Sequence, residues 1–223
     1  MKLFEKVMYP VLIILVAFFL YSAKSDQEYY FNELVSVGGL IQWLTIWTLV
    51  FASVVCFYRA YILKPFRGSF FATCSIIFGV IYLIFALDEM SWGQIVFNFK
   101  SPEFFLQRNT LGETNLRHLT IMGFELSDIV FTLSIRILAT LYFIVLPVTY
   151  LKVPAVKKFA NRLSLPVPRY TQIAAYVIFG ALMYLFPQGT KHVVFEFIFY
   201  WLLVLLMYNP LNEEVFSRKS LVR

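Results

Sequence analysis

Long apolar segments alternate with short polar segments along this chain of 223 residues. A helix of roughly 17 to 25 apolar residues crosses the hydrocarbon core of a bilayer. Six segments with few charged side chains approach or reach that length, at residues 7–23, 38–58, 69–87, 129–150, 170–186 and 193–208. The pattern predicts an all-α fold, a polytopic transmembrane helix bundle of about six spans that occupies residues 1–223 as a single domain.

The composition excludes an ordinary soluble globular domain. Apolar residues make up 60% of the chain and charged residues 14%, whereas soluble domains average about 45–50% and about 25%. The mean hydropathy is +0.74. The net charge of +6 is compatible with two classes of protein, a nucleic-acid binder or a membrane protein with basic cytoplasmic loops, so the placement of the charges has to decide between them.

Basic and acidic residues fall in alternate connections. When both termini are placed in the cytoplasm, thirteen of the 19 Lys and Arg residues lie inside, and nine of the 13 acidic residues lie outside. The positive-inside rule therefore predicts a multi-pass protein of the inner (plasma) membrane with cytoplasmic N- and C-termini. Since this orientation in the membrane explains the excess of basic residues, we expect the lipid bilayer and no nucleic acid as a partner.

The first apolar segment has two interpretations, a signal peptide or a signal anchor. It follows Lys2 and Lys6, as both would. A cleavage site after Ala23 would place Tyr21 where signal peptidases need a small residue. We therefore expect a retained signal anchor.

The connections differ in character. Residues 64–68 and 187–192 read as tight turns, and 152–169 reads as a basic cytoplasmic loop against anionic headgroups. The longest connection, residues 88–128 between the third and fourth spans, lies on the extracytoplasmic side and is too patterned for a simple linker. Within it, Ser101 as N-cap and Pro102 at the first helical position predict a short interfacial helix through about Arg108. Residues 88–128 are called the external segment below.

The external segment contains the candidate catalytic residues. A carboxylate near hydrocarbon loses hydration unless it is paired, which suits it to proton chemistry or cation binding. Interface anchoring by Trp92, with acids in water, is the alternative for the start of the segment. We select Asp88, Glu89, Glu113 and His118 as candidate catalytic residues, and Trp92, Gln94, Asn115 and Arg117 as candidate substrate-binding residues.

A polar stripe on the predicted fourth span adds a cation. Asp128, Thr132, Arg136 and Thr140 recur every four residues and so share one face of a helix. An arginine at the depth of Arg136 needs a partner or water, so we expect it to face the bundle interior or a water-filled cavity, with Glu196, Asp128 or the Asp88–Glu89 pair as its possible partners. A buried structural ion pair and a site for an anionic headgroup are both compatible with this placement, and we add Arg136 and Glu196 to the candidate substrate-binding residues.

Two short sequences in the external segment resemble those of a known family. Residues 88–94 read DEMSWGQ and residues 112–116 read GETNL. Over about thirty residues they are similar to an uncharacterised bacterial multi-pass membrane family with the pattern EExSWGQ followed by GExNL. That pattern has His where this chain has Arg117. The resemblance implies that the external segment is a functional site and names no chemistry for it.

Motifs of other chemistries are missing from the sequence. It contains no GxSxG nucleophile motif, no HExxH zinc motif, and no GxxxxGK[ST] or GxGxxG nucleotide loop. Cys56 and Cys74 lie in apolar runs and read as packing residues. We therefore expect no cofactor and no metal.

Three functions remain open. The first is a membrane enzyme that acts on a lipid or lipid-linked envelope substrate, with Glu89 as acid or base and Arg136 at an anionic headgroup. The second is a non-enzymatic subunit of a membrane or envelope complex, in which the external segment contacts a membrane-protein partner or a second copy of the chain. The third is a small transporter or channel.

Overall fold

The computed structural model describes residues 2–127 and 133–217, which fold almost entirely into helices. The first half contains α1 (Leu3–Ser25), α2 (Gln27–Tyr29), η1 (Tyr30–Val35), α3 (Leu40–Arg67) and α4 (Ser69–Glu89). The external segment contains η2 (Ser91–Gly93), α5 (Gln94–Phe97), α6 (Glu103–Arg108), β1 (Thr120–Ile121) and β2 (Phe124–Glu125). The second half contains α7 (Ile135–Thr140), η4 (Leu141–Val145), α8 (Leu146–Lys152), α9 (Pro154–Arg162), α10 (Tyr170–Leu182), η5 (Met183–Leu185), α11 (Lys191–Tyr208) and η6 (Glu213–Phe216).

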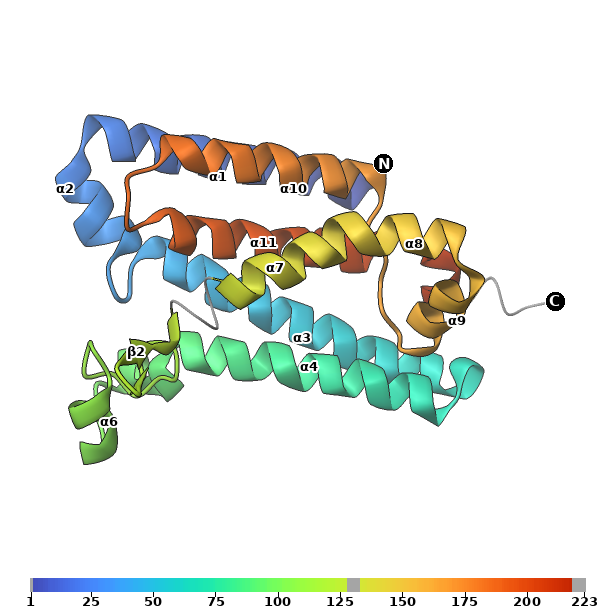
Figure 1. Cartoon of the computed structure of the whole chain (residues 1–223), viewed down its shortest axis with the longest axis horizontal. Helices are drawn as coiled ribbons and strands as arrows, with labels where there is room; N and C mark the ends of the chain where they lie inside the picture. The colour runs from blue at the N-terminus through green and yellow to red at the C-terminus, as the bar shows by residue number, and fades with distance from the viewer. Residues whose placement is uncertain (1, 128–132, 218–223) are drawn as a thin grey trace.

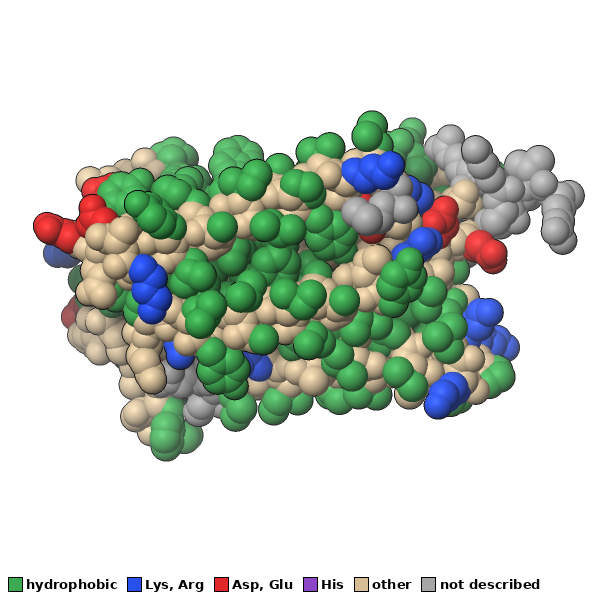
Figure 2. Space-filling model, turned by 90° about the horizontal axis from the view of Figure 1, so that it is seen from above, with side chains coloured by type: hydrophobic (Ala, Val, Ile, Leu, Met, Phe, Trp, Pro, Cys, Tyr) green, Lys and Arg blue, Asp and Glu red, His purple; other side chains and the backbone are tan. Residues whose placement is uncertain are grey.

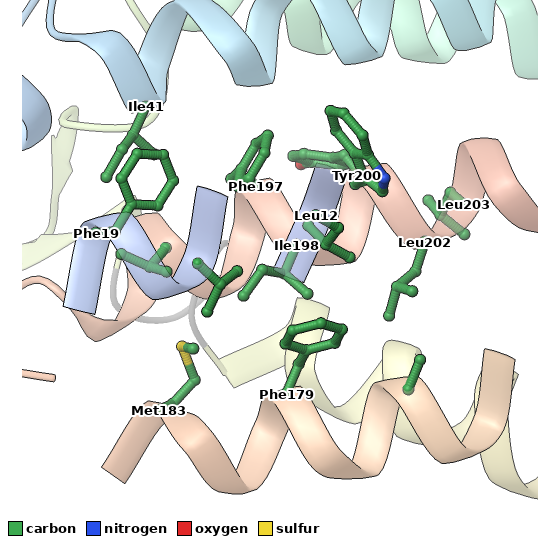
Figure 3. Close-up of a cluster of buried hydrophobic side chains, with 14 of the residues drawn as sticks. Leu12, Phe19, Ile41, Phe179, Met183, Phe197, Ile198, Tyr200, Leu202 and Leu203 are labelled. Carbon is green, nitrogen blue, oxygen red and sulfur yellow. The ribbon is translucent and has the colours of Figure 1, made fainter. Parts of the chain in front are cut away.

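The helix α11 lies at the centre of the bundle. It packs against α1, α3 and α10, while α4 packs along α3. The long helices run in roughly the same direction (Figure 1). A helix that is apolar on all sides belongs inside, and the buried residues of α11 run almost without a break from Phe197 to Met207. Figure 3 shows Ile198 of α11 beside Leu12 of α1 and facing Phe179 of α10, with Phe197 on the opposite side of α11 from Phe179.

The lengths of the apolar helices and the apolar surface are those of a multi-pass membrane protein. Five helices are long and apolar enough to cross a membrane, namely those at Leu3–Ser25, Gln27–Arg67, Ser69–Glu89, Ile135–Lys152 and Lys191–Tyr208. A shorter apolar helix covers Tyr170–Leu185. On the face shown in Figure 2, hydrophobic side chains cover the middle and most charged side chains lie toward the two ends. The predicted helical membrane bundle is confirmed at this level.

The helices do not begin and end at the bounds of the predicted spans. The second span continues nine residues past residue 58, because α3 tolerates Pro65 in its last turn and ends only where Gly68 adopts φ +84°. The basic stretch 152–169 was predicted as a loop, but it contains the helix α9, which begins with Pro154 at its first position. Part of the predicted fourth span, residues 129–132, lies outside the described residues.

The external segment folds into short elements. The helix α6 occurs close to the predicted position, but Pro102 is its N-cap, and Ser101 donates its hydroxyl to Gln94 Oε1 and Gly112 O instead. The strands β1 and β2 form an antiparallel hairpin that the sequence analysis did not predict. Met122 and Gly123 turn this hairpin with φ values of +53° and +84°, as a tight two-residue turn requires.

Polar contacts close the opposite end of the bundle. Arg169 Nη2 and Lys2 Nζ contact the carboxylate of Glu213 at 2.6 and 3.2 Å. Asn209, just after α11, donates to Glu5 Oε2 at 2.7 Å. These contacts join the start of α1 to the end of α11 and to the residue before α10.

The helices α3 and α4 are in tight contact at Gly79. A Cβ atom on Gly79 would lie 2.8 Å from the Phe57 ring, and Ser53 donates its hydroxyl to Gly79 O at 2.8 Å. Small residues allow this kind of contact between membrane helices, where close packing and hydrogen bonds replace the hydrophobic effect.

Gly79→Ala is expected to destabilise the bundle by about 1–3 kcal/mol, because the added methyl group forces Phe57 or the two helices apart. Gly180→Ala is the matched control. A Cβ atom on Gly180 meets nothing within 4 Å, and alanine favours a helix more than glycine does. Thermal unfolding in mild detergent should show a lower midpoint for Gly79→Ala alone. Equal midpoints for the two variants would contradict the close contact.

Candidate functional site

A polar pocket of about 230 Å³ lies where the external segment covers the end of the bundle. Gln42 and His192 contribute to it from α3 and α11, and Val37 from the connection before α3. Six of the predicted site residues line this pocket, namely Asp88, Glu89, Glu113, Asn115, Arg117 and His118. Residues that are far apart in the sequence therefore meet in one place.

Three buried charges join the external segment to the bundle. Arg117 Nη2 contacts Glu89 Oε2 of α4 and Glu196 Oε2 of α11, each at 2.7 Å. The exposed fractions of these side chains are only 12, 7 and 4%. We call Arg117, Glu89 and Glu196 the ion triad. At low dielectric, charges of opposite sign attract strongly, and each would be costly to bury alone.

The ion triad keeps its cation charged. Burial by itself would lower the pKa of Arg117, but the carboxylates of Glu89 and Glu196 raise it by more, so the pKa lies above its usual range. Arg117 is therefore a fixed positive charge in the wall of the pocket. The carboxylate of Glu89, which we expected to act as acid or base, is instead held in this ion pair.

Backbone amides of the external segment are held by side chains at the end of α4 and just beyond it. Asp88 Oδ1 accepts from Leu116 N at 2.7 Å, and Gln94 Oε1 accepts from Thr114 N at 2.8 Å. On the other side of the pocket, Gln42 accepts from Gly38 N and donates to Glu89 O. The backbone amides of Thr114 and Leu116 are thus fixed by hydrogen bonds, and the side chain of Arg117 is fixed by the ion triad.

Glu113 is held by a second small network. Ser91 Oγ and Asn115 Nδ2 donate to Glu113 Oε2 at 2.8 and 2.6 Å, and Asn109 Nδ2 donates to Asn115 Oδ1 at 2.9 Å. Ser91 has a left-handed backbone (φ +49°), which costs free energy in a residue other than glycine. This turn places its hydroxyl on Glu113 and leaves the next side chain, Trp92, 46% exposed.

His118 is oriented by a residue that the sequence analysis did not select. Its Nδ1 lies 2.6 Å from Glu125 Oε1 on β2. Burial by itself would raise the pKa of Glu125, but hydrogen bonds from His118 and Ser127 lower it by more. The pKa of Glu125 therefore lies below its usual value. A neutral imidazole that donates from Nδ1 keeps a lone pair on Nε2, as in oriented histidine bases. Only the β1–β2 hairpin brings Glu125 there, and the sequence analysis did not predict it.

Arg136 does not line this pocket, and of its two predicted surroundings, the bundle interior or a water-filled cavity, the structure does not give it the bundle interior. Its side chain is exposed on α7, with the guanidinium 6.0 Å from the centre of the Phe195 ring. A separate pocket of about 320 Å³ contains it together with Lys191 and Thr140. Glu196 forms its ion pair with Arg117 of the external segment, and among the described residues it forms none with Arg136. Asp128 and Thr132, the other members of the stripe, lie outside the described residues.

The titratable groups are spread around the pocket rather than gathered on one point. Within residues 2–127 and 133–217, no group of three or more His, Cys, Asp and Glu side chains is placed to hold a metal ion. Cys56 and Cys74 are free thiols in these ranges, and neither lines the polar pocket.

The chain was compared with protein-family models, with curated proteins and with solved structures, and none of them matches.

Arg117→Gln is expected to destabilise the protein by about 3–5 kcal/mol, because it leaves two carboxylates buried without their cation. Adding Glu196→Gln to this variant should restore part of the loss, since one uncompensated charge disappears. The measurement is the unfolding midpoint in mild detergent, together with limited proteolysis of the external segment.

Arg108→Gln is the matched control for this experiment. Arg108 is an exposed cation of the same segment, at 5.0 Å from the centre of the Phe104 ring. Its replacement should change the midpoint little. If Arg117→Gln unfolds and is cleaved like Arg108→Gln, the ion triad does not hold the segment.

Proposed function

We propose that the chain is a six-span protein of the bacterial inner membrane with both termini in the cytoplasm. The start of α1 and the end of α11 lie at the same end of the bundle (Figure 1), as an even number of crossings requires. The basic helix α9 lies near that end, which agrees with the positive-inside rule. In this orientation Tyr170–Leu185 is the sixth span, the polar pocket is extracytoplasmic, and α6 lies in the interface with Phe104 and Leu106 exposed.

The pocket is proposed to bind and act on the polar head of a lipid or lipid-linked substrate. The observation that carries this proposal is the His118–Glu125 pair at the wall of a pocket that also contains Asp88 and Glu113. With Nδ1 held by Glu125, His118 Nε2 is suited to remove a proton from a hydroxyl group or a water molecule at the head. Asp88 and Glu113 offer carboxylate oxygens to hydroxyl or amine groups, while the charge of Arg117 is matched by Glu89 and Glu196.

The rim of the pocket favours an amphipathic substrate over a freely soluble one. Val37 and Leu111 line the pocket, yet both are more than half exposed. Apolar side chains at such a rim provide a path for an acyl or isoprenoid chain while the head occupies the polar wall. In this assignment Glu89 and Glu196 hold Arg117, and neither transfers a proton.

The test uses the purified chain in nanodiscs made from the total lipid extract of its native membrane. Mass spectrometry should show one lipid class decreasing and a product accumulating with the wild type. His118→Gln should slow this change by at least about 100-fold, the usual contribution of a general base. Gln107→Ala is the control, because Gln107 is exposed and bonds only to Glu103 in the described structure, so its rate should equal that of the wild type. An unchanged lipid profile with folded wild-type protein would contradict the enzyme proposal.

A second function, as a subunit of a membrane or envelope complex, has one observation in its favour. Phe97, Met122 and Phe124 of the external segment are 78, 94 and 65% exposed. Apolar side chains exposed beyond the helical bundle are typical of an interaction surface. A stoichiometric membrane-protein partner or a second copy after gentle extraction, combined with no lipid turnover, would favour this function over the enzyme.

A further inference from the structure

A second cavity lies between α3, α4, α7 and α11, separate from the polar pocket, and it is open on one side, where Ile81 and Leu138 are 40 and 62% exposed. It has a volume of about 370 Å³, within the range of small-molecule sites. α3, α4, α7, η4 and α11 line it, and residues 164–166 close one end. Most of its wall consists of apolar and aromatic side chains, among them Phe78, Phe85, Leu138 and Phe199.

One cation faces this apolar space. Among the described residues that line the cavity, Arg59 of α3 is the only one with a full charge. Its guanidinium donates to Met207 O and lies 4.3 Å from the centre of the Phe216 ring. Within the part of the chain that the structure describes, no carboxylate forms an ion pair with it. A guanidinium has five N–H donors, so one carbonyl leaves most of them available to a ligand.

Hydroxyl groups of Ser75, Ser164 and Tyr142 line the cavity together with Arg59, and Tyr82 and Tyr200 contribute two more. Ser75 Oγ and Ser164 Oγ lie 2.6 Å apart, and Tyr142 donates its hydroxyl to Pro166 O at 2.6 Å. Along α4 the lining then continues from Ser75 to Phe85, which at the helical rise of 1.5 Å per residue is a length of about 15 Å. The cavity thus combines a cation and several hydroxyl groups with a long apolar wall.

We propose that this cavity binds a single-chain amphiphile with an acidic head, either a carboxylate or a phosphate. The head contacts the Arg59 guanidinium with help from the Ser75 and Ser164 hydroxyls, and the chain extends along α4 toward Phe85. A buried cation without a carboxylate partner is stabilised by an anionic ligand, and the apolar wall is stabilised by the chain.

This site is independent of the proposed function of the polar pocket. Tyr200 lines the far end of the apolar cavity and interacts electrostatically with all three members of the ion triad. The triad therefore stands between the two spaces. The head at Arg59 lies at the opposite end of the cavity from the triad, so binding there does not require His118 or the external segment.

The experiment measures equilibrium binding of radiolabelled dodecanoate to the full chain in phosphatidylcholine nanodiscs, with empty nanodiscs as background. Dodecyl phosphate, dodecanol and butyrate are the competitors. Dodecanoate should bind saturably, and dodecanol and butyrate should compete poorly, because one lacks the charge and the other lacks the chain. Stronger competition by dodecyl phosphate than by unlabelled dodecanoate would identify a phosphate head, and the reverse order a carboxylate.

Two variants separate the charge from the cavity. Arg59→Gln should weaken dodecanoate binding by about 10- to 100-fold, the value of a charge-assisted hydrogen bond, and should remove the preference over dodecanol. Leu138→Trp keeps Arg59 but adds bulk from α7 at a side chain that lines the cavity and is 62% exposed, so it should weaken dodecanoate and dodecanol binding alike. Lys64→Gln is the control, since it removes an exposed cation of the same helix end outside the cavity and should leave binding unchanged.

Three results would overturn the proposal. Absence of saturable dodecanoate binding to the wild type would show that the cavity is no ligand site. Equal affinity for dodecanoate and dodecanol in the wild type would show that the cation does not select an acidic head. If Arg59→Gln fails to fold, the Leu138→Trp variant decides alone, and unchanged dodecanoate binding to it would place the ligand elsewhere.

Discussion

A guanidinium held between two carboxylates at the end of an apolar bundle constrains the rest of this structure. Burying Arg117, Glu89 or Glu196 alone would cost several kcal/mol, so each of the three requires the other two. The two carboxylates come from α4 and α11, and the cation comes from the external segment. The segment must therefore lie on the bundle whenever these helices are packed, and the hydrogen bonds of Asp88 and Gln94 to its backbone then fix how it lies.

The polar pocket follows from this docking. Its floor is formed by the ends of helices and its wall by residues 111–118, which approach only because Arg117 reaches the ion triad. The same docking places the β1–β2 hairpin so that Glu125 orients His118 toward the pocket. An apolar cavity lies on the other side of the triad, with Arg59 at its far end. The triad thus separates a polar space, suited to proton transfer, from an apolar space that contains one cation.

Much of the architecture could be predicted from the sequence, because hydrophobic length and charge placement are properties of the chain itself. The apolar runs indicated the membrane helices, and the clustering of polar residues between 88 and 118 indicated where a pocket would form. The choice between Arg117 and Arg136 as partner of Glu196 could not be predicted, because sequence spacing gives the depth of a residue in a span but not the helix face that meets a distant loop. The role of Glu125 depends on a hairpin of two residues per strand, which is too short to leave a periodic signal.

Hydrogen–deuterium exchange of the wild type in mild detergent tests the docking of the external segment most directly. The amides of Thr114 and Leu116 donate to Gln94 and Asp88 beneath the segment, whereas Phe99 and Lys100 lie in the exposed connection between α5 and α6. The docked structure predicts exchange at Thr114 and Leu116 at least about 100-fold slower, after correction for intrinsic rates, than at Phe99 and Lys100. Equally fast exchange at all four amides would contradict it, since the segment would then be open to water and the pocket would have no wall.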